Sequence, residues 1–474
     1  MFNAIGILLA VLAPALVFAA GEAPVQTTAD TAIPPLVLSP TFAEDDTHKS
    51  EWDFGWHGYA RMPIGFSEKP LGPHGPVLID DDYNKSGFAY LRVNERDWVE
   101  LDLSAEHKGT RLVAGLFAAP ISEWVRQTTL VSSSPAFAFI EHQWAPADAL
   151  SLKVRSGVFW RRLGYVDAYD TYLIGRTHAS GIGVEATIAN MVTIEGGAAG
   201  RARTEKKAFS PVTWAVLGFN NPYLELKLYY LDTWSEDEYP GKQGFEVGRL
   251  WVTGSDIHVR LPGVGKLHYG LAFYNARKVE NLHAVETLHA EDGQAFRKHY
   301  LGGQSDNGTG EVQAHVWDLL WQPARTLHAL VSPRSAGPLR GLDLRFFGMA
   351  TWTASPDVEF NDRRAFKWGT DLRYEPTHFF SAGQTRPFLG VQFHRVAPNA
   401  DLESTSFRIW APRIGIVPAP LCEIFVQWAI YDYGDNVNSQ QFDQPRLSEE
   451  ATRNGGGVIA PDTDVFKIHA QLRW

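Results

Sequence analysis

The segment 466–474 (FKIHAQLRW) alternates strictly between apolar and polar residues. The apolar positions are Phe466, Ile468, Ala470, Leu472 and Trp474, and every residue between them is polar. Successive side chains of a β-strand point to opposite faces, so this alternation predicts a strand with one dry and one wet face.

An aromatic residue at the last position of such a strand is typical of outer-membrane β-barrels, whose strands need about 9–11 residues with alternating faces. The same alternation recurs along the chain, for example in WVELDLSAEH (98–107) and YLELKLYYL (223–231). The polar faces carry charges of both signs interleaved with aromatics, which suits a polar lumen. We therefore predict an all-β fold, a transmembrane antiparallel barrel of about 16–18 strands. The residues expected to face lipid are Val99, Leu101, Leu103, Leu224, Leu226 and Leu228.

Composition agrees with a barrel, argues against a nucleic-acid partner and excludes an internal disulfide. A chain of 474 residues is long enough for one large barrel or for three ordinary domains. Aromatic residues make up 12% of the chain and include 16 Trp, as expected for aromatic girdles at the two membrane interfaces. The net charge of −11 argues against nucleic acid as a partner. The single cysteine, Cys422, excludes an internal disulfide.

The N-terminal region predicts export from the cytoplasm. The apolar run 5–18 is too short to span a bilayer, and small residues follow it, so 1–19 is predicted to be a signal peptide. The residues before this run include no Lys or Arg, which departs from the usual signal pattern. Residues 20–50 are rich in Pro, Thr, Ala and acids and are predicted to form a flexible periplasmic segment. The barrel is expected to occupy 51–474.

Loop lengths predict which end of the barrel faces which side of the membrane. Tight turns are expected at Ala145–Asp148 and at Pro262–Gly263, whereas Lys278–Gly310 reads as a long polar loop. Short periplasmic turns and long external loops are the pattern of outer-membrane barrels.

Three segments carry a resemblance to a known family. They are WHGYARMPIG (56–65), NERDWVELDL (94–103) and the longer stretch 154–185, which contains RRLGYVDAYDTY. In these the chain resembles the maltoporin-like sugar porins, patchily over about the first 200 residues and by architecture alone beyond them. The resemblance implies an 18-stranded homotrimer for passive uptake of oligosaccharides, with an aromatic slide and a track of charged residues lining the lumen.

The resemblance also implies roles for particular residues. Tyr59 and Trp98 match slide aromatics, and Arg61 and Glu100 match their charged partners. Arg162, Asp167 and Tyr169 match the inward-folded constriction loop, and Tyr223 and Tyr229 are candidates to extend the slide. Two departures put saccharide selectivity in doubt: Arg473 stands where the family has tryptophan, and the family's cysteine pair is missing.

The expected function is passive diffusion of small hydrophilic solutes, with saccharides foremost, across the outer membrane of a Gram-negative bacterium. The alternatives are a polysaccharide-export barrel of the alginate-exporter type, which calls for a strongly basic lumen, and an outer-membrane hydrolase. No catalytic residue, cofactor or metal ligand is predicted, and Asp80–Asp82 is interpreted as a solvated loop rather than a calcium site. Expected partners are membrane lipids and lipopolysaccharide, and the assembly machinery through the strand ending at Trp474.

Overall fold

The computed structural model describes twelve main stretches of the chain and four short pieces between them. The described residues are 52–67, 98–118, 137–162, 165–166, 171–172, 176–202, 209–235, 248–279, 308–330, 339–354, 363–376, 379–380, 384–397, 400, 406–433 and 463–473. The chain divides into two units, Met1–Pro40 and Thr41–Trp474, and every described residue belongs to the second. The predicted signal peptide (1–19) and the whole predicted periplasmic segment (20–50) lie outside the described residues.

Strands dominate the described residues. They are β1 (Asp53–Ser67), β2 (Trp98–His107), β3 (Thr110–Ala118), β4 (Phe137–Ala147), β5 (Leu150–Arg162), β6 (Tyr165–Val166), β7 (Thr171–Tyr172), β8 (Arg176–Ile188), β9 (Val192–Ala202), β10 (Phe209–Asn220), β11 (Leu224–Ser235), β12 (Gly248–Leu261), β13 (Gly265–Arg277), β14 (Gly310–Trp321), β15 (Leu342–Ala354), β16 (Arg363–Tyr374), β17 (Arg386–Ala397), β18 (Phe407–Ala419), β19 (Cys422–Tyr433) and β20 (Thr463–Arg473). Among the described residues there is one helix, α5 (Pro323–Leu330), which lies in the chain between β14 and β15. In the described part of the chain, no helix is long and apolar enough to cross a membrane.

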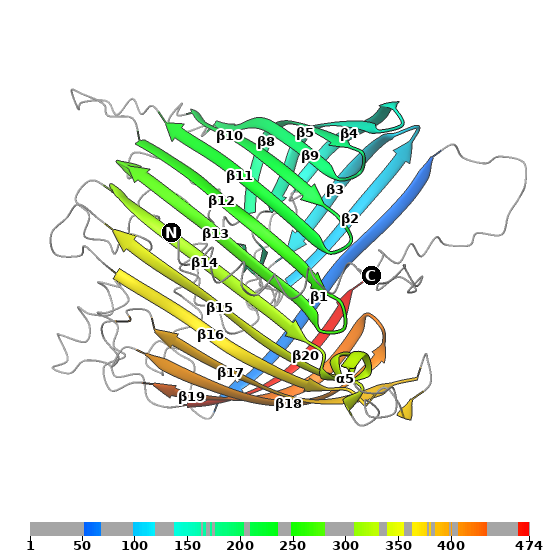
Figure 1. Cartoon of the computed structure of the whole chain (residues 1–474), viewed down its shortest axis with the longest axis vertical. Coiled ribbons are helices and arrows are strands. Elements are labelled where there is room, and N and C mark those ends of the chain that lie inside the picture. The colour runs from blue at the N-terminus through cyan, green and yellow to red at the C-terminus, as the bar shows by residue number, and fades with distance from the viewer. Residues whose placement is uncertain are drawn as a thin grey trace, which may run out of the picture. The chain divides into compact units, whose positions relative to one another are not determined.

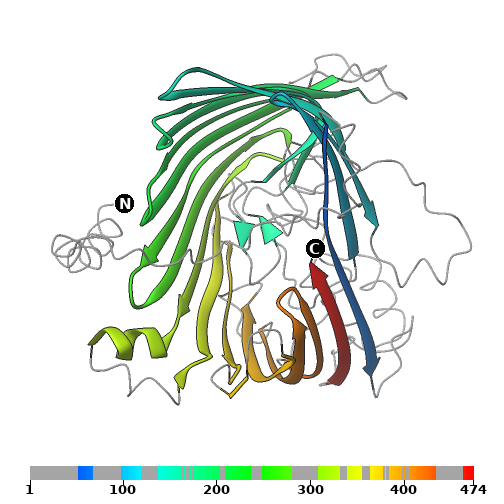
Figure 2. The ribbon, with the colours of Figure 1, turned by 90° about the vertical axis from the view of Figure 1, so that its right-hand side faces the viewer.

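Eighteen strands form one closed antiparallel barrel (Figures 1 and 2). Each wall strand pairs with the next along the chain, and β5 pairs with β8 because β6 and β7 form a separate small sheet. The first strand closes the ring, since β1 pairs with both β2 and β20. Tyr59 accordingly lies opposite Glu100 on one side and opposite Arg473 on the other. The predicted barrel of about 16–18 strands is confirmed.

The outward face of the wall is apolar. Leu103 and Leu228 are 48% and 45% exposed, and Ile414 is 59% exposed. Val99, Leu101, Leu224 and Leu226 occupy the same face, two or four residues along their strands from Leu103 or Leu228. The prediction that these residues face lipid is confirmed, because a single-layered closed sheet has no second sheet to cover its outer surface.

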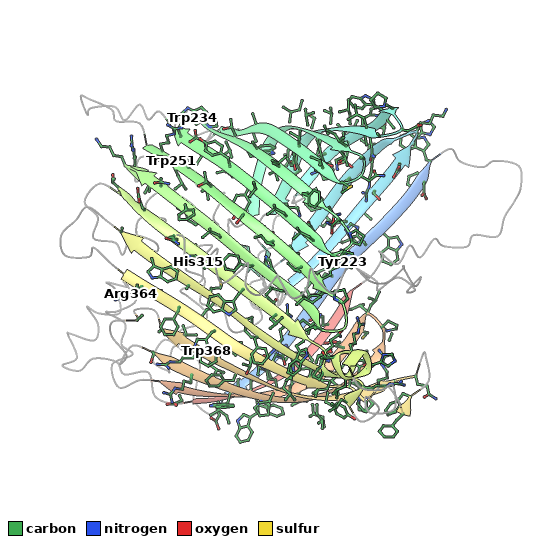
Figure 3. All side chains as sticks on the ribbon, viewed as in Figure 1. Tyr223, Trp234, Trp251, His315, Arg364 and Trp368 are labelled. Carbon is green, nitrogen blue, oxygen red and sulfur yellow. The ribbon has the colours of Figure 1, made fainter. Side chains whose placement is uncertain are left out.

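Aromatic side chains gather towards the strand ends of this outer face. Trp234 and Trp251 lie near the long-loop ends of β11 and β12 (Figure 3). Arg249 and Arg277 each place their guanidinium 5.3 Å from the centroid of the Trp251 ring, and Arg249 donates to Asp232 Oδ1 at 2.9 Å. Apolar walls flanked by aromatic and charged residues are the form of barrels that span the bacterial outer membrane, which places this barrel in the outer membrane of a Gram-negative cell.

The short connections lie together at one end of the barrel. Lys108 and Gly109 join β2 to β3 with φ of 46° and 78°, and this pair of positive angles is the type I′ geometry that suits a two-residue hairpin. The turn at Pro262–Gly263 is confirmed between β12 and β13. The turn predicted at Ala145–Asp148 was wrong by about two residues: β4 continues to Ala147, with a register irregularity after Trp144, and Asp148 and Ala149 make the turn.

Candidate functional site

The inner face of the wall carries ion pairs around much of its circumference. These charged residues alternate along their strands with the exposed apolar residues, so they face the lumen. The pairs on one side are Arg155–Glu141 at 2.5 Å, Lys153–Glu185 at 2.9 Å and Lys227–Glu225 at 2.5 Å. Those on the other side are Arg413–Asp371 at 2.6 Å, Arg373–Glu423 at 2.8 Å and Arg386–Glu375 at 2.5 Å. We call this set the lumen ion pairs.

The lumen ion pairs make the described wall polar without giving it one dominant sign. Every carboxylate in the set has a Lys or Arg partner within salt-bridge distance. Arg345 likewise holds Asp318 through two hydrogen bonds. Such a surface offers hydrogen-bond donors and acceptors side by side. It is not the strongly basic wall that export of an acidic polymer requires.

Strands β1 and β2 bring together the four residues that the resemblance singled out. Tyr59 lies directly opposite Glu100, and Arg61 lies directly opposite Trp98. The four backbone positions share the lumen side of the wall, since the alternate positions include the outward pair Trp56 and Leu103. Tyr59 is partly exposed, whereas the side chains of Arg61, Trp98 and Glu100 lie outside the described residues.

The expected constriction segment leaves the barrel wall. Arg162 is the last residue of β5, and the next two strands, β6 and β7, pair only with each other. Figure 2 shows this small hairpin, drawn as two short cyan arrows, within the ring of wall strands, and β6 lies against β14. Asp167 and Tyr169 fall between β6 and β7, and they and the Arg162 side chain lie outside the described residues.

The two tyrosines predicted to extend the aromatic slide do not lie open on the lumen face. Tyr223 lies in the turn before β11, at the short-turn rim, and is 56% exposed. Tyr229 faces inward but is only 4% exposed, and its hydroxyl donates to the backbone carbonyl oxygen of Leu271 at 3.0 Å. A covered ring has no face to offer a sugar, so the structure argues against stacking on Tyr229.

Several inward aromatics instead cover glycines on neighbouring strands. A Cβ atom at Gly197 would lie 2.1 Å from Cζ2 of Trp214, and one at Gly254 would lie 2.4 Å from the hydroxyl of Tyr229. Phe137 covers Gly115 in the same way, since a Cβ there would lie 2.0 Å from its ring. Packing an aromatic ring over a cross-strand glycine stabilises sheet register. These aromatics therefore hold the wall together, a role that period-two alternation alone does not distinguish from solute binding.

Part of the inner wall is aliphatic, whereas the sequence predicted a lumen face of charged residues interleaved with aromatics. Leu231, Leu250, Val252, Ala272 and Val312 are buried in one cluster on β11–β14. They share the inward face with Asp256 and lie towards the long-loop ends of their strands. The side chains of this cluster are covered and so add no open apolar surface to the inside of the wall.

Comparisons with solved structures find chains that align with this one over most of their length. Pseudomonas aeruginosa OccK11 (OpdR) shares 8% identity, with 89% of this chain and 95% of that chain covered and a TM-score of 0.43. P. aeruginosa OpdL shares 10% identity over 89% and 99% of the two chains, with a TM-score of 0.42, and Acinetobacter baumannii OccAB2 shares 10% over 88% and 98%, with a TM-score of 0.39. No protein-family model matches the chain, and no curated protein matches it. The similarities are weak, and the assignment of the barrel rests on the strand pairing itself.

Proposed function

We propose that the protein is an outer-membrane channel through which small hydrophilic solutes diffuse passively, with saccharides as the preferred class. The observation that carries the proposal is the closed wall, apolar outside and lined inside by the lumen ion pairs. A large closed barrel has room for an aqueous path, and paired charges exchange hydrogen bonds with a passing solute in place of its hydration shell.

Saccharide preference is supported by the juxtaposition of β1 and β2. Tyr59 lies opposite Glu100, and Arg61 lies opposite Trp98. Two aromatic residues and two charged residues therefore occupy neighbouring positions on the lumen face. Aromatic rings stack on the apolar faces of pyranoses, while charges bond the hydroxyls at the ring edge. Each stacking contact contributes about 1 kcal/mol, and such weak binding permits flux.

Replacing Tyr59 and Trp98 together by Ala is expected to weaken saccharide block of conductance several-fold while leaving ion current nearly unchanged. The measurement is a maltooligosaccharide titration of purified protein in planar bilayers. Leu101→Ala, on the outward face of the strand that begins at Trp98, is the matched control and should change neither quantity. Sugar block that survives the double substitution would leave a general diffusion channel as the better description.

We also propose that three copies of the chain associate through the outward face of β13–β15. There, His315 Nδ1 lies 2.7 Å from the hydroxyl of Tyr269, and His315 Nε2 lies 2.7 Å from Nε2 of Gln313 (Figure 3 labels His315). Polar groups that face lipid are costly, so a polar cluster on an otherwise apolar surface favours contact with another protein chain. In planar-bilayer recordings of the purified protein, the three channels of a trimer are expected to close in three equal steps of current.

The export and hydrolase alternatives have less support. The described lumen pairs its cations with carboxylates, whereas export of an acidic polysaccharide calls for a basic wall. A hydrolase would pass no ion current in planar bilayers and would cleave lipid or peptide substrates instead. Lipopolysaccharide is proposed to contact the long-loop rim, where Arg249 and Arg277 flank Trp251 and offer cations to its phosphates.

A further inference from the structure

Three potential metal ligands converge on the inner wall at one hairpin. His258 of β12 and His268 of β13 are directly opposite in the antiparallel register. Asp256 lies two residues before His258, on the same face of the strand. The tight turn at Pro262–Gly263 joins the two strands, so the backbone places the three side chains close together.

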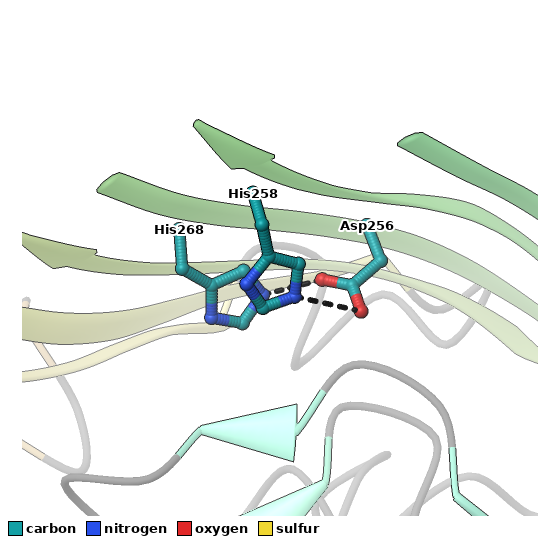
Figure 4. A group of neighbouring side chains, drawn as sticks. All are labelled: Asp256, His258 and His268. Carbon is teal, nitrogen blue, oxygen red and sulfur yellow. Dashed lines mark hydrogen bonds and ion pairs between the residues drawn. The ribbon is translucent and has the colours of Figure 1, made fainter. Parts of the chain in front are cut away.

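The imidazole nitrogens of the two histidines face the carboxylate oxygens of Asp256 (Figure 4). His268 Nε2 bonds Oδ1 of Asp256, and His258 Nε2 lies 3.5 Å from Oδ2 of the same carboxylate. The two imidazole rings are stacked with their centroids 4.0 Å apart and their planes at 4°. One ligand atom from each residue lies within 4.8 Å of the others. The side chain of Asp256 is 6% exposed and that of His258 is 41% exposed, so the group is anchored in the wall and open on one side.

Two imidazoles and one carboxylate suit particular metal ions. Imidazole ligands favour Zn²⁺, Cu²⁺, Ni²⁺ and Fe²⁺, whereas Ca²⁺ and Mg²⁺ take oxygen ligands. A tetrahedral zinc ion with bonds of about 2.1 Å needs donors roughly 3.4 Å apart, so the two stacked imidazoles have to turn out of their parallel arrangement to point at one ion. Three protein ligands leave the remaining position open to water or solute.

Neighbouring charges favour a cation at this place. Glu225 on β11 lies opposite His258, and Asp318 on β14 lies opposite His268. Lys227, opposite Asp256, bonds Glu225, and Arg345 on β15 holds Asp318. Three carboxylates against two cations leave one net negative charge when both imidazoles are neutral. Two protonated rings at the observed separation would repel each other, whereas one shared metal ion joins them.

We propose that Asp256, His258 and His268 bind one divalent transition-metal ion, of the zinc, nickel or copper type, in the lumen wall. The binding itself does not depend on solute transport. Its effect on conductance does rest on the proposed channel function, since a bound dication adds positive charge beside the aqueous path.

The test is isothermal titration of the purified, chelator-treated full chain in detergent with ZnCl₂. One zinc ion per chain is expected to bind to this site. His258→Ala and His268→Ala should each weaken this binding at least about tenfold. Asp256→Asn, which keeps the size of the side chain, should weaken it too, and MgCl₂ should not compete. Heat-modifiable migration on gels confirms that each variant forms the barrel.

The chain contains 16 histidines, so binding elsewhere needs its own control. His142→Ala alters an exposed histidine bonded to Thr110 on a different part of the wall, and its zinc binding should equal that of the wild type. Unchanged zinc stoichiometry and affinity in a folded His258→Ala/His268→Ala variant would overturn the proposal, whatever the conductance measurements show. A wild-type chain that binds no zinc would overturn it as well.

Discussion

Gly197→Ala is expected to destabilise the barrel by about 3 kcal/mol or more, an effect at the upper end for a single added methyl group. The new Cβ would lie 2.1 Å from Cζ2 of Trp214 and 2.6 Å from the carbonyl oxygen of Ile182. Trp214 cannot easily move away, because its Nε1 donates to Glu195 Oε1 at 3.1 Å and its ring packs edge-on against Phe159. The Ile182 carbonyl belongs to the backbone of β8, so relieving this contact requires the strands to separate.

The adjacent glycine provides the matched control. A Cβ at Gly196 has its nearest contact at 3.7 Å, an ordinary van der Waals distance, so Gly196→Ala should have nearly wild-type stability. Urea unfolding of the two variants refolded into phospholipid vesicles, followed by tryptophan fluorescence, measures the difference. Equal midpoints for Gly196→Ala and Gly197→Ala would show that Trp214 does not lie over Gly197.

Deleting Trp474 is expected to abolish insertion into the outer membrane of cells and to leave refolding of the purified chain into detergent intact. The proposed reason, which rests on the resemblance, is that the assembly machinery recognises the strand ending at Trp474 through this aromatic residue. The strand pairing of β20 with β1 and β19 ends at or before Arg473, so the deletion removes no described wall pairing. Trp474→Phe keeps an aromatic terminus and should insert normally.

Fractionation of outer membranes and periplasm measures this effect, and refolding in detergent is followed by heat-modifiable migration. Normal outer-membrane levels of the truncated chain would remove the support for recognition at Trp474. Failure to refold in detergent would instead mean that Trp474 is needed for the barrel itself.

Alternation along the chain was sufficient to predict the barrel and its outward face. Leu103 and Leu228 could be placed because a closed wall has only two sides, and lipid selects the apolar one. The turn predicted at Pro262–Gly263 also implies which residues of the two flanking strands lie opposite each other. A hairpin centred on Gly263 pairs His258 with His268, so the paired histidines follow from the turn once the register is considered.

Other features depend on partners that alternation does not reveal. Tyr229 has the spacing of a lumen aromatic, but whether its ring is covered depends on Gly254 of the next strand and on Leu271 of the strand beyond. The inward placement of Leu250 and Val252 was missed for a related reason. They alternate with Arg249 and Trp251, and only continuity with Asp256 further along β12 shows which set faces inward.

Single-channel recording of the purified protein in planar bilayers without sugar tests the central claim most directly, that the barrel encloses a continuous aqueous path. The wild-type chain should produce discrete, stepwise increases in current, with the current proportional to voltage at low potential. The same preparation should be checked for insertion by co-flotation with vesicles and by resistance of the barrel to added protease. A chain that is inserted and protected by these criteria, yet passes no ions, would contradict the account.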